Sequence, residues 1–237
     1  MKTLRSRLAV CALVLLLAAG TLVAFPGCGG GLPGVEEVWE KSLEAEKGIN
    51  SLHMEISISY ENTNFGGGQI QTTSINVSGE NVQASSSLFG QSFSEIIVVN
   101  GKQYSRTMGS EEWTEQTATV DRQSLTQMQG FANLPSEASS SENLGLETLG
   151  GSDAYHLSFA LTPDEVKSLF KNVQASQLTS NAGGEVDVWV EEETSFRLKY
   201  EALIRNANIT EQIGFGDIRV TATITSINEP ISIAPPV

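Results

Sequence analysis

The chain has 237 residues, of which 28 are acidic and 14 are Lys or Arg, and its formal net charge is −14. Such an acidic chain lacks the basic surface that nucleic-acid binding requires, and anionic lipid headgroups would repel it. Both cysteines, Cys11 and Cys28, lie near the start of the chain. The rest of the chain therefore has no thiol for a disulfide, a nucleophile or a metal site, and its stability must come from a hydrophobic core.

The first 28 residues have the pattern of an export signal. Three basic residues precede an uncharged apolar run, Leu8 to Phe25, and Gly27 and Cys28 follow it. The segment resembles a bacterial lipoprotein signal, in which a Cys after a small residue is acylated and becomes the first residue of the mature chain. We therefore expect residues 1–27 to be a signal peptide and Cys28 to be the lipid anchor. The exported chain, with a formal charge of −17, would be extracytoplasmic and anchored to the cell membrane.

An alternative is that Leu8 to Phe25 stays uncut and spans the membrane as one helix, because about 18 apolar residues are just long enough. Gly20 and Pro26 would weaken such a helix. The glycine-rich residues 28–34 predict a flexible tether. Residues 35–237 contain no segment that separates two cores, so we expect them to form a single domain.

The exported part begins with a helix and a long strand. Apolar residues at helical spacing predict a helix over residues 35–49. From Leu52 to Tyr60 apolar and polar residues alternate, which predicts a strand with one apolar and one solvent-facing side. Similar alternation and intervening turn residues predict further strands over residues 70–77, 81–88, 96–99, 102–106, 144–149, 154–161, 186–190, 196–204 and 218–227.

Two local signals are specific. Asn100-Gly101 between apolar runs predicts a tight hairpin. Thr162, Pro163 and Glu165 match an N-cap, a proline at the first helical position and a capping-box glutamate, and they predict a helix that continues through Phe170 and Val173. A less regular pattern over residues 120–131 predicts another helix. The remaining segments are expected to be connections: a glycine turn at 66–68, a serine-rich surface loop at 135–142 and a loop at 206–217.

The sum is nine to eleven strands joined by sequential hairpins, with about three helices. Sequential hairpins imply antiparallel pairing, since parallel neighbours need long crossovers. A sheet this wide must curl. The predicted fold class is α+β, with a large, strongly curved antiparallel sheet, a half-barrel, and about three helices on its concave side.

The sequence offers little for catalysis. His53 and His156 are the only histidines, and each has the opposite parity from the apolar residues of its strand, so both should face solvent. Neither lies in a metal-binding or catalytic motif. The acidic runs 111–112 and 191–193 place neighbouring carboxylates on opposite faces of a strand, which is typical of a solvated turn or edge. We therefore predict a protein that is not an enzyme and that has no cofactor and no metal.

Several segments of the exported part resemble the LppX/LprG lipoprotein family. They are residues 52–56, 98–104 followed by Trp113, 188–190 followed by 196–198, and the ending 227–233. The resemblance implies a LolA-like architecture, in which helices plug the concave side of a half-closed sheet and leave an apolar cavity. It also implies a function, because members of that family carry acylated lipids or glycolipids across the cell envelope.

The functional expectation is a lipoprotein that binds the acyl chains of a lipid or glycolipid in an apolar cavity and carries it through the cell envelope. The alternative is an envelope interaction or sensor module with the same fold and a filled core. No protein partner can be named. The candidates for the cavity lining are the apolar residues of the amphipathic elements: Met54, Ile56, Ile58, Tyr60, Leu157, Phe159, Val166, Leu169, Phe170, Phe196, Leu198 and Tyr200.

Overall fold

The computed structural model describes residues 31–107, 109–122, 133–169, 181–210 and 213–236. The chain divides into two compact units, Met1–Leu32 and Pro33–Val237. The first unit lies almost wholly outside the described residues. All residues of the hydrophobic core cluster belong to the second unit. That unit therefore has a complete core of its own, and we expect it to fold without the residues that precede it.

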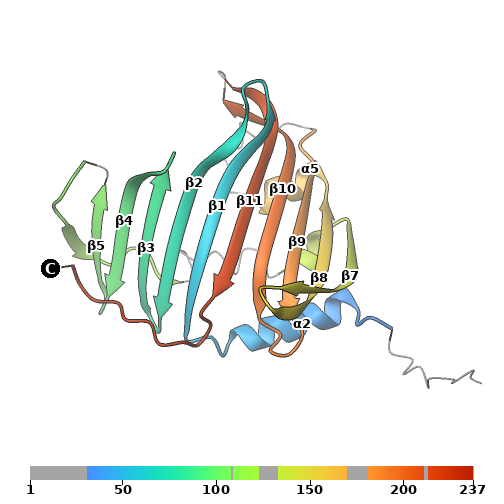
Figure 1. The fold of residues 1–237 in the computed structure, drawn as a ribbon, viewed down its shortest axis with the longest axis horizontal. Coiled ribbons are helices and arrows are strands. Elements are labelled where there is room, and N and C mark those ends of the chain that lie inside the picture. Colours follow the sequence, from blue (N-terminus) through green and yellow to red (C-terminus); the bar gives the residue numbers. More distant parts are fainter. Residues whose placement is uncertain (1–30, 108, 123–132, 170–180, 211–212, 237) are drawn as a thin grey trace, which may run out of the picture. The chain divides into compact units, whose positions relative to one another are not determined.

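The second unit contains one sheet of eleven strands (Figure 1). The strands are β1 (Ser51–Thr63), β2 (Gly66–Ser78), β3 (Asn81–Leu88), β4 (Gln91–Val99), β5 (Lys102–Thr107), β6 (Thr114–Thr117), β7 (Ser140–Leu149), β8 (Ser152–Leu161), β9 (Gly184–Glu191), β10 (Arg197–Thr210) and β11 (Gly214–Thr225). Their order is β6-β5-β4-β3-β2-β1-β11-β10-β9-β8-β7, and every pair of neighbours is antiparallel. The first and last strands of the sequence order therefore meet at its centre, where β1 pairs with β11.

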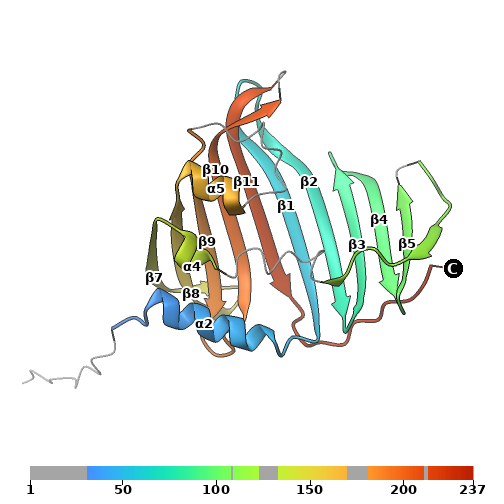
Figure 2. The ribbon, with the colours of Figure 1, turned by 180° about the vertical axis from the view of Figure 1, so that it is seen from behind.

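The described part of the chain has three helices, α2 (Val35–Glu46), α4 (Leu134–Glu137) and α5 (Pro163–Leu169). Figure 2 shows them on one face of the sheet, over the half that contains β7 to β10. We call this face the inner face and the opposite one the outer face. The predicted α+β fold with an antiparallel sheet and three helices is confirmed, and the sheet is not closed.

The local signals explain the core. In β1, Leu52 and Met54 are buried while Glu55, on the other parity, is exposed. On the inner face the ring of Trp39 from α2 meets the ring of Phe159 from β8 edge to face, with centroids 5.4 Å apart. Such a pair adds about 0.5 to 1.5 kcal/mol beyond the burial of its surface.

Two capping and turn predictions are confirmed. The backbone N–H of Thr162 donates to Glu165 Oε2 at 2.7 Å, and the N–H of Glu165 donates to Thr162 Oγ1 at 3.4 Å, which is the reciprocal capping box at the start of α5. Asn100 and Gly101 form the β4–β5 turn with φ angles of 52° and 75°. The predicted helix around 120–131 and the extension of α5 through Val173 fall largely outside the described residues.

Three predicted connections were wrong. Residues 135–142 include the end of α4 and the start of β7, whose serines need only one pairing partner because β7 is an edge strand. Residues 206–217 mostly continue β10 and β11, because a register shift between Ile204 and Ala207 lets the two strands keep pairing past Asn206. Residues 66–68 belong to β2, and the turn lies before them.

Candidate functional site

Part of the predicted cavity lining is buried core. Met54 is 1% exposed, and Leu157, Phe159 and Val166 are 0% exposed. Leu157 and Phe159 belong to β8, which α5 contacts, whereas Met54 belongs to β1, outside the half of the sheet that the helices cover (Figure 2). All four side chains belong to the core cluster, and their role as a cavity lining stays a prediction.

A second group of predicted residues is only half-buried. Ile56, Ile58 and Tyr60 follow Met54 along the inner face of β1. They pack against the core cluster, but part of each side chain stays exposed. Ile56 lies opposite Ala222 of β11, and Ile58 lies opposite Val220. These side chains form a continuous apolar strip over the β1–β11 boundary, which we call the central strip.

Tyr60 is the last residue of the central strip on β1, and its phenol is neutral. Partial burial raises the pKa of its phenol, because the ionised form would lose hydration. Tyr60 pairs with Ile218 of β11, which is itself buried. The strip therefore carries no charge along its length on β1.

Polar groups replace apolar ones beyond the central strip. Across β2, Ile56 pairs with Thr73 and Ile58 pairs with Gln71, and Thr73 pairs in turn with Ser86 of β3. The hydroxyls of Thr73 and Ser86 are 3.0 Å apart and share a hydrogen bond. Across the inner face, the row that begins at Ile56 of β1 therefore changes from an apolar side chain to hydroxyl groups on β2 and β3.

The remaining candidates are scattered. Leu169 of α5 and Phe196 before β10 are half-buried and pack against the core cluster. Leu198 is half-buried but lies at a register shift and does not join that cluster. Phe170 and the predicted anchor Cys28 lie outside the described residues.

The same register shift places a charge in the core that the alternation pattern missed. Regular alternation along this strand would place Phe196, Leu198 and Tyr200 on one face and Arg197 on the other. Instead Arg197 is 1% exposed and makes a two-point ion pair with Glu46 at the end of α2.

Aromatic rings enclose that ion pair. The Arg197 guanidinium lies 4.9 Å from the ring centroid of Trp39 and 5.3 Å from that of Tyr200. Burial raises the pKa of the Tyr200 phenol, which stays neutral. Tyr200, a predicted cavity residue, is 6% exposed and belongs to the core cluster. The pair fixes the end of α2 on β10.

On the outer face, His156 is part of an aromatic and carboxylate cluster. Its ring stacks on Trp189 with centroids 4.4 Å apart. Its two ring nitrogens lie 2.8 Å from Glu147 Oε1 and 3.1 Å from Asp187 Oδ1. Trp189 Nε1 also donates to Glu147, and the hydrogen bonds from Trp189 and then from His156 lower the pKa of Glu147. Both histidine nitrogens are engaged, as is typical of a structural surface residue.

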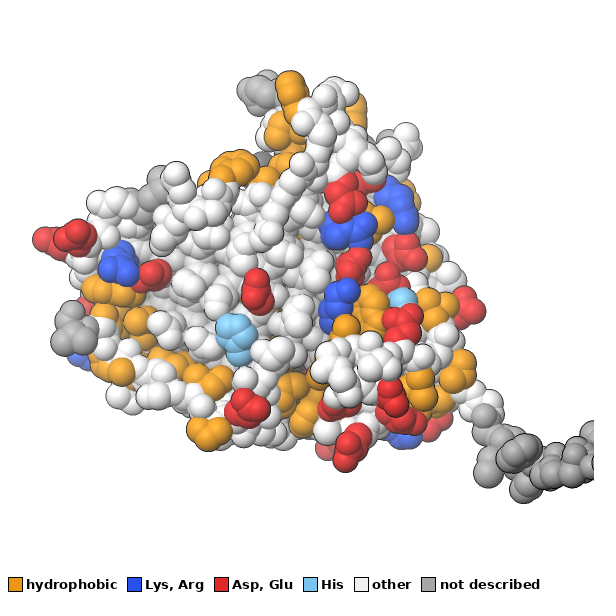
Figure 3. Space-filling view, in the orientation of Figure 1, with side chains coloured by type: hydrophobic (Ala, Val, Ile, Leu, Met, Phe, Trp, Pro, Cys, Tyr) orange, Lys and Arg blue, Asp and Glu red, His pale blue; other side chains and the backbone are white. Residues whose placement is uncertain are grey.

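Ion pairs extend this cluster across the sheet. Lys199 covers Trp189 at 4.2 Å from the ring centroid and pairs with Glu201 at 3.0 Å. Arg219 of β11 contacts both Glu201 and Glu61 of β1. In Figure 3 the charged side chains on this face gather over β8 to β11, and uncharged polar surface covers much of the rest.

His53 is also on the outer face, as predicted. Its Nδ1 lies 2.8 Å from Asn76 Oδ1 of the neighbouring strand. Among the described residues no group of three or more His, Cys, Asp or Glu is arranged to hold a metal ion.

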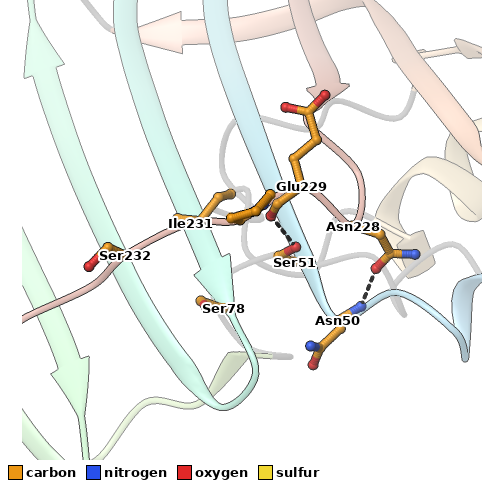
Figure 4. Close-up of a pocket in the computed structure, with 8 residues that line it drawn as sticks. Asn50, Ser51, Ser78, Asn228, Glu229, Ile231 and Ser232 are labelled. Carbon is orange, nitrogen blue, oxygen red and sulfur yellow. Dashed lines mark hydrogen bonds between the residues drawn. The ribbon is translucent and has the colours of Figure 1, made fainter.

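A groove of about 410 Å³ lies at the start of β1, with both polar and apolar residues in its lining, and sequence reasoning did not anticipate it (Figure 4). The segment after β11 forms one wall. Ser51 Oγ donates to the carbonyl of Glu229 at 2.6 Å, and the N–H of Asn50 donates to Asn228 Oδ1 at 2.7 Å. These bonds fasten the C-terminal segment across the strand ends.

The family follows from a comparison of the whole second unit. Residues 35–233 match the model of the LppX_LprAFG lipoprotein family. The chain belongs to this family. The resemblance seen in the sequence is thereby confirmed, and membership agrees with an extracytoplasmic, membrane-anchored protein. No curated protein matches the chain.

Solved structures confirm the fold. Lipoprotein LppX from Mycobacterium tuberculosis is 13% identical with a TM-score of 0.54, and the match covers 85% of this chain and 100% of that one. LprF from Mycobacterium bovis is 13% identical with a TM-score of 0.51, and the match covers 87% and 99%. At this identity the likeness concerns the fold alone. Within the described ranges we find no helix both long and apolar enough to cross a membrane.

Proposed function

We propose that this lipoprotein binds the acyl chains of a lipid or glycolipid on the central strip and carries that lipid through the cell envelope, anchored by Cys28. The observation that supports binding is the strip itself, formed by Ile56, Ile58 and Val220, which packs on a dry core yet stays half-exposed. Covering apolar surface is favourable by about 25 cal/mol per Å². An acyl chain laid along the strip would gain that energy without displacing any core residue.

The change from apolar to polar groups supports a lipid with a polar head. The acyl chain would lie along β1 and β11, while Thr73 and Gln71 on the next strand, β2, and Ser86 on β3 offer hydroxyl and amide groups. Such groups can hydrogen-bond to sugar or ester oxygens. Acyl chains themselves carry no group that such a surface could recognise, so selectivity would come from the head.

We further propose that binding involves no covalent chemistry. Each histidine lies on the outer face, away from the central strip, and is hydrogen-bonded to a neighbouring strand. A catalytic base must reach the proton that it removes, within about 3 Å. The strip and the histidines are on opposite faces of the sheet, so they cannot share a substrate.

A specific observation supports the alternative function, an interaction or sensor module. Four of the predicted cavity residues, Met54, Leu157, Phe159 and Val166, are fully packed. A sensor or interaction module with a filled core would show the same packing over the whole inner face. The two functions differ in whether space for a ligand exists beside Ile56.

The test is a pair of substitutions on one strand, made in Pro33–Val237. Ile56→Trp places a large ring on the central strip, and Ser57→Trp places the same ring on the outer face. We expect Ile56→Trp to weaken binding of a fluorescent fatty-acid analogue at least tenfold, which is about 1.4 kcal/mol, and Ser57→Trp to leave it unchanged. Lipid extraction and mass spectrometry of the parent protein should identify the bound lipid.

Thermal melting must accompany the binding assay. Overpacking a filled core costs about 1 to 3 kcal/mol. Loss of binding with an unchanged melting temperature supports the carrier function. An unfolded Ile56→Trp variant, with no lipid extracted from the parent protein, would refute it in favour of the interaction module.

A further inference from the structure

Three phenylalanine side chains are exposed at hairpin tips. Phe65 lies in the β1–β2 turn and is 79% exposed, Phe89 lies in the β3–β4 turn and is 72% exposed, and Phe215 begins β11 after the β10–β11 turn and is 63% exposed. The antiparallel order brings these three turns to the same end of the sheet, at the top of Figure 1. Hydrophobic side chains are visible at that end in Figure 3. We call this end the phenylalanine edge.

The three tips form a stepped edge: the β1–β2 and β10–β11 tips are nearly level, whereas Phe89 bonds to Ile70, five residues from Phe65 along β2, so the β3–β4 turn lies roughly 16 Å lower along the strands. A Cβ on Gly216 would lie 2.7 Å from Thr63 Cγ2 and 2.8 Å from the carbonyl oxygen of Glu61, so glycine is needed there for the β10–β11 hairpin to pack against the β1–β2 hairpin. Measured across the strands, the centres of neighbouring hairpins are two strands apart, which is about 10 Å. The rings are thus fixed on a rigid sheet but do not form one contiguous patch.

Phe89 occupies a backbone conformation that disfavours it. The β3–β4 turn has Phe89 and Gly90 with φ angles of 50° and 77°, close to the 52° and 75° of Asn100 and Gly101 at the other end of the sheet. In this turn both central residues need positive φ, which asparagine tolerates and a bulky residue does not. The N–H of Phe89 donates to the carbonyl of Ile70 at 2.7 Å, which holds the turn in place. Burial does not offset this strain, because the ring is largely exposed. Stability therefore does not explain why a phenylalanine is at this position.

Two of the three tips lie in stretches without charge, whereas Phe215 lies between Glu211 and Asp217 in the sequence. Residues 62–79 and 81–94, which include the first two tips, contain no charged side chain in a protein with 28 acidic residues. An acidic protein is repelled by anionic headgroups except where its own charge is absent. A protein partner of ordinary affinity would need about 800 Å² of continuous surface on this side. Separate rings between glycines and serines fit the boundary between headgroups and acyl chains better.

We propose that the phenylalanine edge docks into the surface of a lipid bilayer, with the rings of Phe65, Phe89 and Phe215 inserted. The inference rests on the proposed function for its purpose: the inner face of β1 leads from Ile56 through Tyr60 to the tip that carries Phe65. A docked protein would therefore hold the end of the central strip against the membrane. The lipid would enter and leave at this end.

Flotation of Pro33–Val237 with phosphatidylcholine vesicles tests the docking. Each single substitution, Phe65→Asn, Phe89→Asn or Phe215→Asn, should lower the partition coefficient about tenfold, and the triple variant should not float with the vesicles. The control is Leu144→Asn on edge strand β7, where the parent leucine is 50% exposed; it should bind like the parent. A parent that does not bind vesicles, or a triple variant that binds like the parent, would overturn the proposal.

Phe89→Asn gives a second result that a structural role would not give. It should raise the melting temperature, because asparagine suits the turn, while it weakens vesicle binding. A lower melting temperature with unchanged vesicle binding would refute a membrane role for this ring.

Fatty-acid binding in the absence of vesicles separates this inference from the proposed function. The triple variant should still bind the fluorescent fatty acid. If the parent docks on vesicles but binds no fatty acid, the docking inference stands and the carrier function fails.

Discussion

Removing Glu46 should destabilise the second unit strongly. The Glu46→Ala substitution leaves the Arg197 guanidinium, which is 1% exposed, without its carboxylate. Removing one partner of a buried ion pair costs about 3 to 5 kcal/mol. For a protein of this size each kcal/mol lowers the melting temperature by about 2 to 4 °C. We therefore expect a decrease of roughly 10 °C, measured by thermal and urea unfolding with tryptophan fluorescence, since Trp39 lies on the pair.

The matched control is on the same helix. Glu37 pairs with Lys41 at 2.8 Å, but both side chains are more than half exposed. Exposed pairs at this spacing contribute very little to stability, because water and salt screen them. Glu37→Ala should therefore change the midpoint of urea unfolding very little.

The double variant, Glu46→Leu with Arg197→Met, separates the charge from the packing. Replacement of a buried ion pair by apolar residues of similar volume is often neutral or stabilising. The double variant should accordingly recover most of the loss caused by Glu46→Ala. If Glu46→Ala costs no more than Glu37→Ala, the ion pair is solvated in solution, and α2 is not held on β10 by this contact.

Two further predictions concern the anchor and the acid response. Cys28→Ala should leave the fold intact and remove the lipid, so intact-mass measurement should show no acyl groups and membrane fractionation should show release; an unchanged mass with membrane retention would mean that residues 8–25 span the membrane instead. The hydrogen bond from Arg219 lowers the pKa of Glu61, so the stabilisation from this pair is present above the ordinary glutamate pKa and is lost as the pH falls through the lower, folded-state pKa. Melting temperatures should thus show Arg219→Met below the parent at pH 7 and the difference shrinking as the pH falls below 4.5, the ordinary glutamate value; a difference that stays constant on acidification would contradict the role of Glu61.

Local rules predicted most of the sheet because they act within one strand or one turn. Alternation from Leu52 to Tyr60 and the Asn100-Gly101 turn need no knowledge of distant residues. The serine-rich start of β7 could not be found in this way. Ser140 and Ser141 are in a strand because they pair with Ala160 and Phe159 of β8, and that pairing is tertiary.

Alternation predicts a face but not how deeply a residue is buried. Met54 and Ile58 lie on the same face of β1, yet only Met54 is fully buried. Burial depends on what covers the sheet, and the residues that cover it, such as Trp39 and Val166, come from helices at other points of the chain. The pattern was also misleading at Arg197, because one residue of register shift exchanges the two faces. The candidate site was therefore predicted as a set of elements and not as a set of residues.

The phenylalanine edge had a signal in the sequence that periodicity does not use. Phe65, Phe89 and Phe215 are each followed by glycine, and each Phe-Gly pair lies near a change of strand direction. Apolar residues are rare at the centre of tight turns because they gain no burial there, and at Phe89 the positive φ makes the choice costly as well. One such residue carries little information. Three such phenylalanines lie at the same end of one sheet, and two of them are in stretches without charge. A contact that all three make is therefore the better explanation. The stability of Phe89→Asn relative to the parent measures the backbone strain at this turn.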